Sequence, residues 1–222
     1  MIIRTGVVNG LRLSLKFSFK SYTTQQGFIF SKSFPDSLKQ EFESSFLIYE
    51  NFVSLTEEEN LMAEFEPHLK RHLYEKDHWD NAISGFRETE KKLFDKRNSP
   101  IIQRIRDISF PSSGKESKIL PYTHILDLAE DGFIKPHVDS IRFCGDRVAV
   151  VSLLSSSIGR FALEKDSSIS VVVLIPRRSL YIMKGLSRYE FTHEILKNQE
   201  SFLDGKFVEK SRRISIICRN EP

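Results

Sequence analysis

The sequence predicts a mainly β domain with flanking helices (α+β): a double-stranded β-helix, or jelly-roll, cupin-like barrel, with N-terminal helices packed outside. Two observations predict this fold. After Phe110 the chain breaks into eight short β-rich runs separated by Gly, Ser, Pro and charged turns. Before Phe110, apolar residues recur at helical spacing. Short strands of this regularity, preceded by amphipathic helices, are typical of jelly-roll barrels.

The helical part is predicted to span about residues 54–110. Its first helix carries an apolar stripe that repeats every four residues, formed by Leu61, Phe65 and Leu69. Two pairs with capping-box spacing lie at its start: Ser54 with Glu57, and Thr56 with Glu59. We expect a second helix over 87–97 (RETEKKLFDKR) and a third over 100–110 (PIIQRIRDISF).

The barrel is predicted over about 118–219, after a loop with the sequence PSSGKESK. Its eight runs, in chain order, are YTHILDL, FIKPHVDS, RVAVVSLL, RFALEK, SISVVVLI, SLYIMKG, RYEFTHEI and RRISIICR. Successive residues of a strand point to opposite faces of the sheet, so residues two or six apart share a face. This alternation decides which polar side chains can meet inside the barrel.

Residues 1–35 contain five basic side chains and no acidic one, and they are rich in Ser and Thr. The segment GLRLSLKFSFKSY can form an amphipathic helix with its basic residues on one side. These properties are typical of a mitochondrial transit peptide, and we therefore expect 1–35 to be a disordered leader. The alternative is a basic arm that contacts RNA or anionic lipid. Residues 36–222 are predicted to form a single domain.

The charge of the body is close to balance. Of the 33 Lys and Arg residues, five lie in 1–35, so the remaining residues carry 28 basic against 30 acidic side chains. This composition gives no sign of a nucleic-acid binder. No apolar run approaches the roughly 18 residues of a membrane-spanning helix. The two cysteines lack CxxC spacing, so a disulfide framework is not expected and a reducing compartment fits. We also expect a monomer.

One stretch, GFIKPHVDSIRFCG (132–145), contains a candidate metal site. His137 and Asp139 are two residues apart, so on a strand they face the same side. A facial-triad iron(II) site needs one further imidazole and leaves three coordination positions open. His193, in the run RYEFTHEI, supplies that imidazole. We predict that His137, Asp139 and His193 bind a metal ion.

The last predicted strand, RRISIICR, follows these three residues in the chain. Its residues Arg213 and Arg219 are six apart and share a face. A barrel site that uses 2-oxoglutarate needs a cation to hold the distal carboxylate, and Arg does this with two parallel hydrogen bonds. The order His-x-Asp, His, Arg therefore favours an oxygenase site.

Other histidines offer weaker alternatives. A second His-x-Asp, His78-Trp79-Asp80, lies between predicted helices and has no strand with arginines behind it. His68 and His72 have the spacing of a zinc pair on a helix, but the glutamate of an H-E-x-x-H motif is missing. We therefore prefer the His137 site.

With these residues in place, the sequence resembles the AlkB family of iron(II)/2-oxoglutarate dioxygenases. KPHVDS, SLYIMKGLSRYEFTHEI and RRISIICR correspond to the family's His-x-Asp strand, its SL-xxx-xG-xxRYxxxH-I block and its closing Arg-x-x-x-x-x-Arg strand. The resemblance runs from about Phe46 to Arg219. It implies the jelly-roll fold, iron(II), 2-oxoglutarate as cosubstrate, O2, and a location in the mitochondrial matrix.

By this resemblance, the metal ligands are those predicted above. The 2-oxoglutarate contacts are Tyr181, Arg213, Ser215 and Arg219. Nucleic-acid-repairing members usually carry an Asn-x-Tyr on the strand before the His-x-Asp, where this chain has Leu126 and Leu128.

The presence of two leucines in place of Asn-x-Tyr bears on which reaction is expected. The resemblance implies a dioxygenase that hydroxylates a C–H bond of an unknown protein or small molecule, with a regulatory role in mitochondria, in metabolism or cell death. The alternative is an N-demethylase acting on mitochondrial RNA or DNA. Since base-flipping enzymes need a pocket that stacks the extruded base, the two leucines disfavour nucleic acid. A third alternative, a cupin that only binds, is disfavoured by the complete triad and both arginines.

Overall fold

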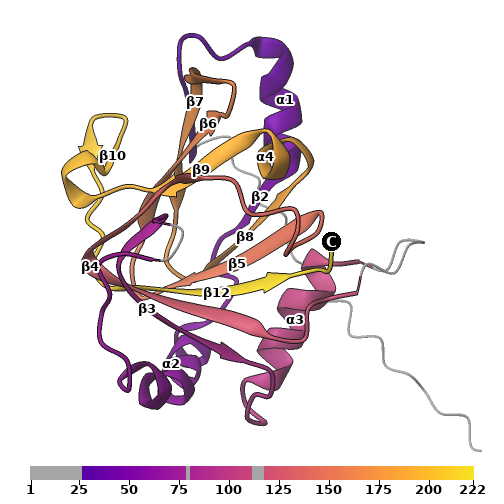
Figure 1. Ribbon diagram of the computed structural model, residues 1–222, viewed down its shortest axis with the longest axis vertical. Helices are drawn as coiled ribbons and strands as arrows, with labels where there is room; N and C mark the ends of the chain where they lie inside the picture. Colours follow the sequence, from indigo (N-terminus) through magenta and orange to yellow (C-terminus); the bar gives the residue numbers. More distant parts are fainter. Residues whose placement is uncertain (1–26, 79–80, 112–117) are drawn as a thin grey trace, which may run out of the picture.

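The computed structural model describes residues 27–78, 81–111 and 118–222. Its main feature is a ten-stranded sheet that curls on itself, with strand order β1-β7-β6-β9-β4-β12-β5-β8-β2 and with β3 paired to β4 (Figure 1). The strands are β1 (Phe28–Phe30), β2 (Phe46–Tyr49), β3 (Ile83–Lys91), β4 (Thr123–His137), β5 (Arg147–Leu153), β6 (Ser157–Leu163), β7 (Asp166–Ile175), β8 (Ser179–Lys184), β9 (Phe191–Ile195) and β12 (Arg213–Arg219). A separate hairpin, β10 (Phe202–Leu203) with β11 (Lys206–Phe207), follows a 3-10 helix at Asn198–Glu200. The predicted jelly-roll barrel is confirmed.

Both faces of the central strands are buried, which explains their nearly continuous apolar sequences. In β5, Val148 and Val150 point into the barrel, whereas Ala149 and Val151 belong to the outer core. The closing strand β12 alternates in the same way. Its Ile214, Ile216 and Cys218 pack outward, and its intervening residues face the barrel interior. The alternation therefore brings polar residues of β12 to one internal surface.

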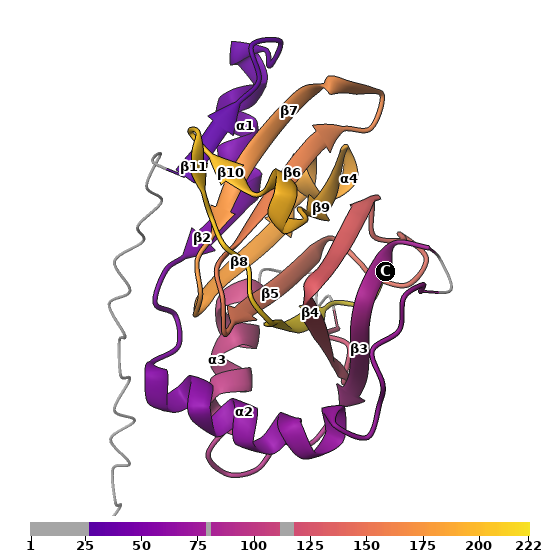
Figure 2. The same ribbon diagram turned by 90° about the vertical axis from the view of Figure 1, so that its left-hand side faces the viewer.

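Two helices cover the outer face of this part of the sheet, and Figure 2 shows both on the same side of β5 and β8. They are α2 (Leu55–Leu69) and α3 (Ser99–Ser109). The predicted stripe of α2 is fully buried, with Leu61, Phe65 and Leu69 each 0% exposed. The helix begins with a capping box at Ser54 and Glu57, the first of the two predicted pairs. The expectation that helices pack outside the barrel is confirmed.

The helix expected over 87–97 is wrong, because residues 87–91 belong to β3 and residues 92–97 form turns and irregular structure. The charged residues of RETEKK favour a helix in isolation, but pairing with β4 decides the outcome. Two predicted strands, YTHILDL and FIKPHVDS, are also one continuous strand, β4. Finally, Arg188 and Tyr189 of the run RYEFTHEI lie in a short helix, α4 (Gly185–Tyr189), and only the second half of that run is a strand.

The folded domain begins earlier than residue 36. Residues Phe28–Phe30 form β1, which pairs with β7, and Phe34 is buried. A helix that the sequence did not predict, α1 (Asp36–Ser45), follows directly. Its Phe42 packs edge-on against Phe161 of the barrel core, with ring centroids 5.6 Å apart. Residues 28–35 of the segment predicted as a leader thus belong to the folded domain, and residues 1–26 lie outside the described part of the chain.

Strand β4 positions the functional site because it bends between two sets of neighbours. Its first half pairs with β12, and its last residues pair with β9. At the bend, Gly132 lies against Gly85 of β3, which has φ +68°, and a Cβ on Gly85 would lie 2.8 Å from the Cα of Gly132. Side chains at these two positions would push β3 and β4 apart. Within the described residues, no helix is long and apolar enough to cross a membrane.

Candidate metal centre

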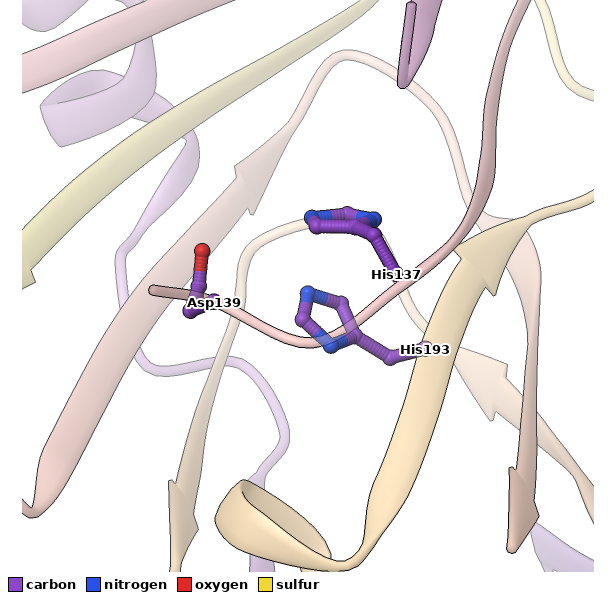
Figure 3. Close-up of side chains that lie close together, drawn as sticks. All are labelled: His137, Asp139 and His193. Carbon is purple, nitrogen blue, oxygen red and sulfur yellow. The ribbon is translucent and has the colours of Figure 1, made fainter. Parts of the chain in front are cut away.

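The three predicted ligands meet at the end of β4. His137 is directly opposite His193 in the antiparallel pairing of β4 with β9, and their ring centroids lie 4.3 Å apart. Asp139 follows in the turn after β4 (Figure 3). One ligating atom from each of the three residues lies within 4.8 Å of the others. Two imidazoles and a carboxylate thus converge on a common point, the arrangement of a facial triad.

A backbone contact fixes which nitrogen of His137 is free. Its Nδ1 lies 2.9 Å from the carbonyl oxygen of Lys135. Because a carbonyl only accepts hydrogen bonds, Nδ1 must carry the proton, and the lone pair is on Nε2. Metal-binding histidines commonly donate their second N–H to a carbonyl or carboxylate in this way.

The electrostatics favour the protonation states that bind a metal. Burial, together with the neighbouring His137, lowers the pKa of His193 to about 3, so the imidazole is neutral at physiological pH. Burial alone would raise the pKa of Asp139. The charges around it, of which Arg219 has the largest effect, outweigh burial and lower the pKa to about 2. Metal ligands must be deprotonated to coordinate, and both groups already are.

The triad lies in a cavity inside the barrel, which we call the inner cavity. All seven predicted site residues line it: His137, Asp139, His193, Tyr181, Arg213, Ser215 and Arg219. Most of the remaining wall is apolar, with Leu126 from β4 and Val148 and Val150 from β5 among its members. The structure therefore brings the predicted residues together from four strands and one turn.

Arg213 provides the most informative contact in this cavity. Its side chain is buried, with the residue 1% exposed. Its Nε donates to Ser152 Oγ at 2.9 Å, and its Nη1 donates to Ser215 Oγ at 2.6 Å. The other terminal nitrogen, Nη2, has no hydrogen-bond partner among the described residues. A buried guanidinium without a counter-ion is unfavourable, so a carboxylate is the group that would complete this site.

The other predicted contacts take distinct positions. Arg219 lies at the metal end, with Nη2 3.6 Å from Asp139 Oδ1. Ser215 accepts a hydrogen bond from Arg213 and so holds that side chain in place. Tyr181 is 7% exposed and packs beside Phe46, with ring centroids 5.7 Å apart.

A buried arginine to which the sequence analysis assigned no role supports the turn that carries Asp139. Arg188 of α4 donates from Nη1 to the carbonyl oxygen of Asp139 at 2.8 Å. Its other nitrogens donate to the carbonyl oxygens of Cys144 and Gly145 at 3.2 and 3.3 Å. These contacts fix the turn at both ends. The sequence signal for this residue is the Arg-Tyr of the SL-xxx-xG-xxRYxxxH-I block, but the backbone carbonyls that it binds carry no side-chain pattern of their own.

Comparison with known proteins agrees with this geometry. The chain is 44% identical over 176 residues to mouse (Mus musculus) alpha-ketoglutarate-dependent dioxygenase alkB homolog 7, mitochondrial, covering 79% of this chain and 78% of that protein. It is 46% identical over 171 residues to the bovine (Bos taurus) protein of the same name, with coverage of 77% and 76%. The chain belongs to the AlkB family of iron(II)/2-oxoglutarate-dependent dioxygenases. Alpha-ketoglutarate and 2-oxoglutarate are the same compound.

Solved structures share the fold of this dioxygenase at low sequence identity. OsALKBH1 superposes with a TM-score of 0.57 at 11% identity, covering 79% of this chain and 96% of that one. A Pseudomonas putida prolyl-4-hydroxylase gives 0.53 at 13% identity, covering 80% and 92%. No family model matches the chain.

The family implies iron(II), 2-oxoglutarate and O2, and the residues of the dioxygenase fit this set. The donor set of two imidazoles and one carboxylate suits iron(II). The unpartnered nitrogen of buried Arg213 suits a carboxylate. Both features lie in the same cavity.

The alternative histidine sites gain no support. His68 lies in α2, but His72 comes after its end, so the pair does not share a helix. His78 has its Nε2 3.6 Å from Glu88 Oε1, and its partners Trp79 and Asp80 lie outside the described residues. Both cysteines, Cys144 and Cys218, are free and buried.

Proposed function

We propose that this dioxygenase hydroxylates a C–H bond of a polypeptide or metabolite in the mitochondrial matrix, where it has a regulatory role. In this proposal His137, Asp139 and His193 hold iron(II), and Arg213 holds the distal carboxylate of 2-oxoglutarate. The observation that carries it is the buried, unpartnered nitrogen of Arg213 in the same cavity as the triad. When bound, the iron and cosubstrate supply oxidation of a substrate C–H by O2, coupled to conversion of 2-oxoglutarate into succinate and carbon dioxide.

The residues of the chain prepare this chemistry. The neutral His193 and the ionised Asp139 present two ligands that need not release protons first. Arg213, held by Ser152 and Ser215, offers a fixed N–H to one end of the cosubstrate. Arg219 and Tyr181 line the same cavity and are proposed as further cosubstrate contacts. Preorganised donors of this kind orient a ligand at little entropic cost.

The cavity wall favours hydroxylation over N-demethylation of a nucleic acid. Leu126 lines the cavity and Leu128 is packed in the same core, both on the inward face of β4. At these two positions the strand offers a flipped base no hydrogen-bonding side chain. An apolar wall suits an aliphatic part of a substrate better.

Conversion of 2-oxoglutarate into succinate tests the proposal. We expect purified protein with iron(II) and O2 to form succinate slowly without added substrate. His137→Ala and Asp139→Ala should abolish both succinate formation and iron(II) binding measured by calorimetry under anaerobic conditions. His72→Ala, which changes an exposed histidine outside the cavity, is the control. Unchanged iron binding in either site variant would refute the metal assignment, and robust demethylation of a methylated oligonucleotide would favour the nucleic-acid alternative.

A further inference from the structure

A groove on the surface leads directly to the metal centre. It is lined from β3 and β4 by Glu88, Glu90 and His124, and from the turn after β4 by Phe143. Asp139 and Arg219 line both this groove and the inner cavity, so the two spaces meet at the metal ligands. We call this space the outer groove. It is the surface that a substrate would contact beside its reacting carbon.

The outer groove is continuous with a neighbouring hollow, with which it shares Glu90, Leu120 and Arg219. A ligand bound beside the metal centre can therefore continue along the surface past Glu90.

One wall of the outer groove is acidic. Two histidines contact the carboxylate of Glu88. His124 Nε2 lies at hydrogen-bonding distance, 2.7 Å from Oε2, and His78 Nε2 lies 3.6 Å from Oε1. The hydrogen bond from His124 is the main reason that the pKa of Glu88 is lowered, so this carboxylate is ionised. Two residues further along β3, Glu90 is exposed and has no ion-pair partner among the described residues. A second negative charge is thus free to pair with a ligand.

The groove also presents an exposed aromatic ring. Phe143 is 67% exposed, although it belongs to a turn that is firmly held. The amides of Phe143 and Cys144 both donate to the carbonyl oxygen of Ser140 at 3.2 Å, and Arg188 binds the two ends of the turn. Its ring therefore offers a fixed apolar surface in the groove, on which the apolar stem of a ligand side chain can pack.

The lining of the outer groove carries more negative than positive charge. Glu88, Glu90 and Asp139 line it, and Arg219 is the one Lys or Arg among its lining residues. Arg219 pairs with Asp139 at 3.6 Å. An acidic lining of this kind disfavours a phosphate backbone.

We propose that the outer groove binds a polypeptide segment through a lysine or arginine side chain, whose charged end pairs with Glu90 and Glu88 and whose aliphatic part packs on Phe143. This inference rests on the proposed function, because it names the substrate class of the same site. A long basic side chain combines an apolar stem with a cationic tip, which matches an aromatic ring next to carboxylates. Glu90 is then a specificity-determining residue that lies outside the catalytic centre.

Binding can be measured directly with defined peptides. The probes are fluorescent nonapeptides of Ala and Ser with a central Lys, norleucine or Glu, and a single-stranded RNA of about 20 nucleotides with the same label. The protein is kept anaerobic with iron(II) and 2-oxoglutarate, so that binding is separated from turnover. Norleucine keeps the stem of lysine and removes the charge. Glu90→Gln is the test variant, and Glu59→Gln, on the exposed surface of α2, is the matched control.

We expect the lysine peptide to bind more tightly than the norleucine peptide, and the glutamate peptide and RNA to bind least. Glu90→Gln should weaken lysine-peptide binding about fivefold, equivalent to about 1 kcal/mol for a partly exposed charge pair. It should leave norleucine-peptide binding unchanged, and Glu59→Gln should change neither. Equal binding of all three peptides, no effect of Glu90→Gln, or tighter binding of RNA would overturn the proposal.

Succinate formation, measured in parallel, separates this proposal from the one on which it rests. If 2-oxoglutarate is converted into succinate but the peptides show no charge preference, the groove assignment fails and the dioxygenase chemistry stands. If the lysine peptide binds with the expected preference but no succinate forms under any condition, the proposed reaction fails and the docking surface stands.

Discussion

Replacing Arg213 by methionine should separate cosubstrate binding from folding. In the structure this guanidinium is 1% exposed, donates to Ser152 and Ser215, and keeps one nitrogen without a partner. Removing one partner of a buried, hydrogen-bonded charge pair typically costs about 3–5 kcal/mol. Because each 1.4 kcal/mol is a factor of ten, the Kd for 2-oxoglutarate should rise roughly 100- to 4,000-fold.

The same substitution should have the opposite effect on the protein without ligand. Methionine removes a buried cation that has no counter-ion in the cavity, so the free energy of unfolding of Arg213→Met should equal or exceed that of wild type. When 2-oxoglutarate is present at 100 times the wild-type Kd, the free energy of unfolding of wild-type protein should rise by about 2.7 kcal/mol. At the same concentration, that of Arg213→Met should hardly change.

Calorimetry of 2-oxoglutarate binding and thermal unfolding with and without the ligand provide the assay. Arg97→Met removes a charge from an exposed side chain (69% accessible) and serves as the control. Iron(II) affinity should be nearly unchanged in both variants, since Arg213 is not among the converging ligands. A Kd for 2-oxoglutarate within threefold of wild type would refute the role assigned to Arg213.

Three further outcomes are expected. Asp127 is 0% exposed and accepts hydrogen bonds from Arg87 and Arg212, so Asp127→Asn should lower the free energy of unfolding in urea by about 3 kcal/mol without changing iron affinity; a loss below 1 kcal/mol would contradict this. Burial lowers the pKa of Lys210 from 10.5 to about 8, so between these values the unfolded chain binds more protons. The stability of wild type relative to Lys210→Met should therefore rise with pH across that window, and a flat difference would oppose it. N-terminal sequencing of the protein from mitochondria should find a start before Gly27, because later cleavage would remove β1; a start at Met1 would show that no leader is removed.

Much of the candidate site could be predicted because strand alternation and metal chemistry constrain it together. A facial triad that contains His137 and Asp139 needs one further imidazole, and His193 lies on a later predicted strand that can supply it. The two-residue period of β12 places Arg213 and Arg219 on the same inward face, as expected.

The features that the sequence did not reveal depend on contacts between distant segments. The charged residues in the second half of β3 favour a helix locally, whereas pairing with β4 determines their structure. The role of Arg188 depends on backbone carbonyls, which carry no side-chain pattern. The role proposed for Glu90 depends on the pairing of β3 with β4, which places this residue opposite His124 at the edge of the site.

A crystal structure of the full chain, grown without O2 and with manganese(II) in place of iron and 2-oxoglutarate present, tests the central claim most directly. We predict one metal ion bound by Nε2 of His137, a carboxylate oxygen of Asp139 and a ring nitrogen of His193, with the distal carboxylate of 2-oxoglutarate on Arg213. A metal held by other residues, or a cosubstrate whose distal carboxylate does not contact Arg213, would contradict the account.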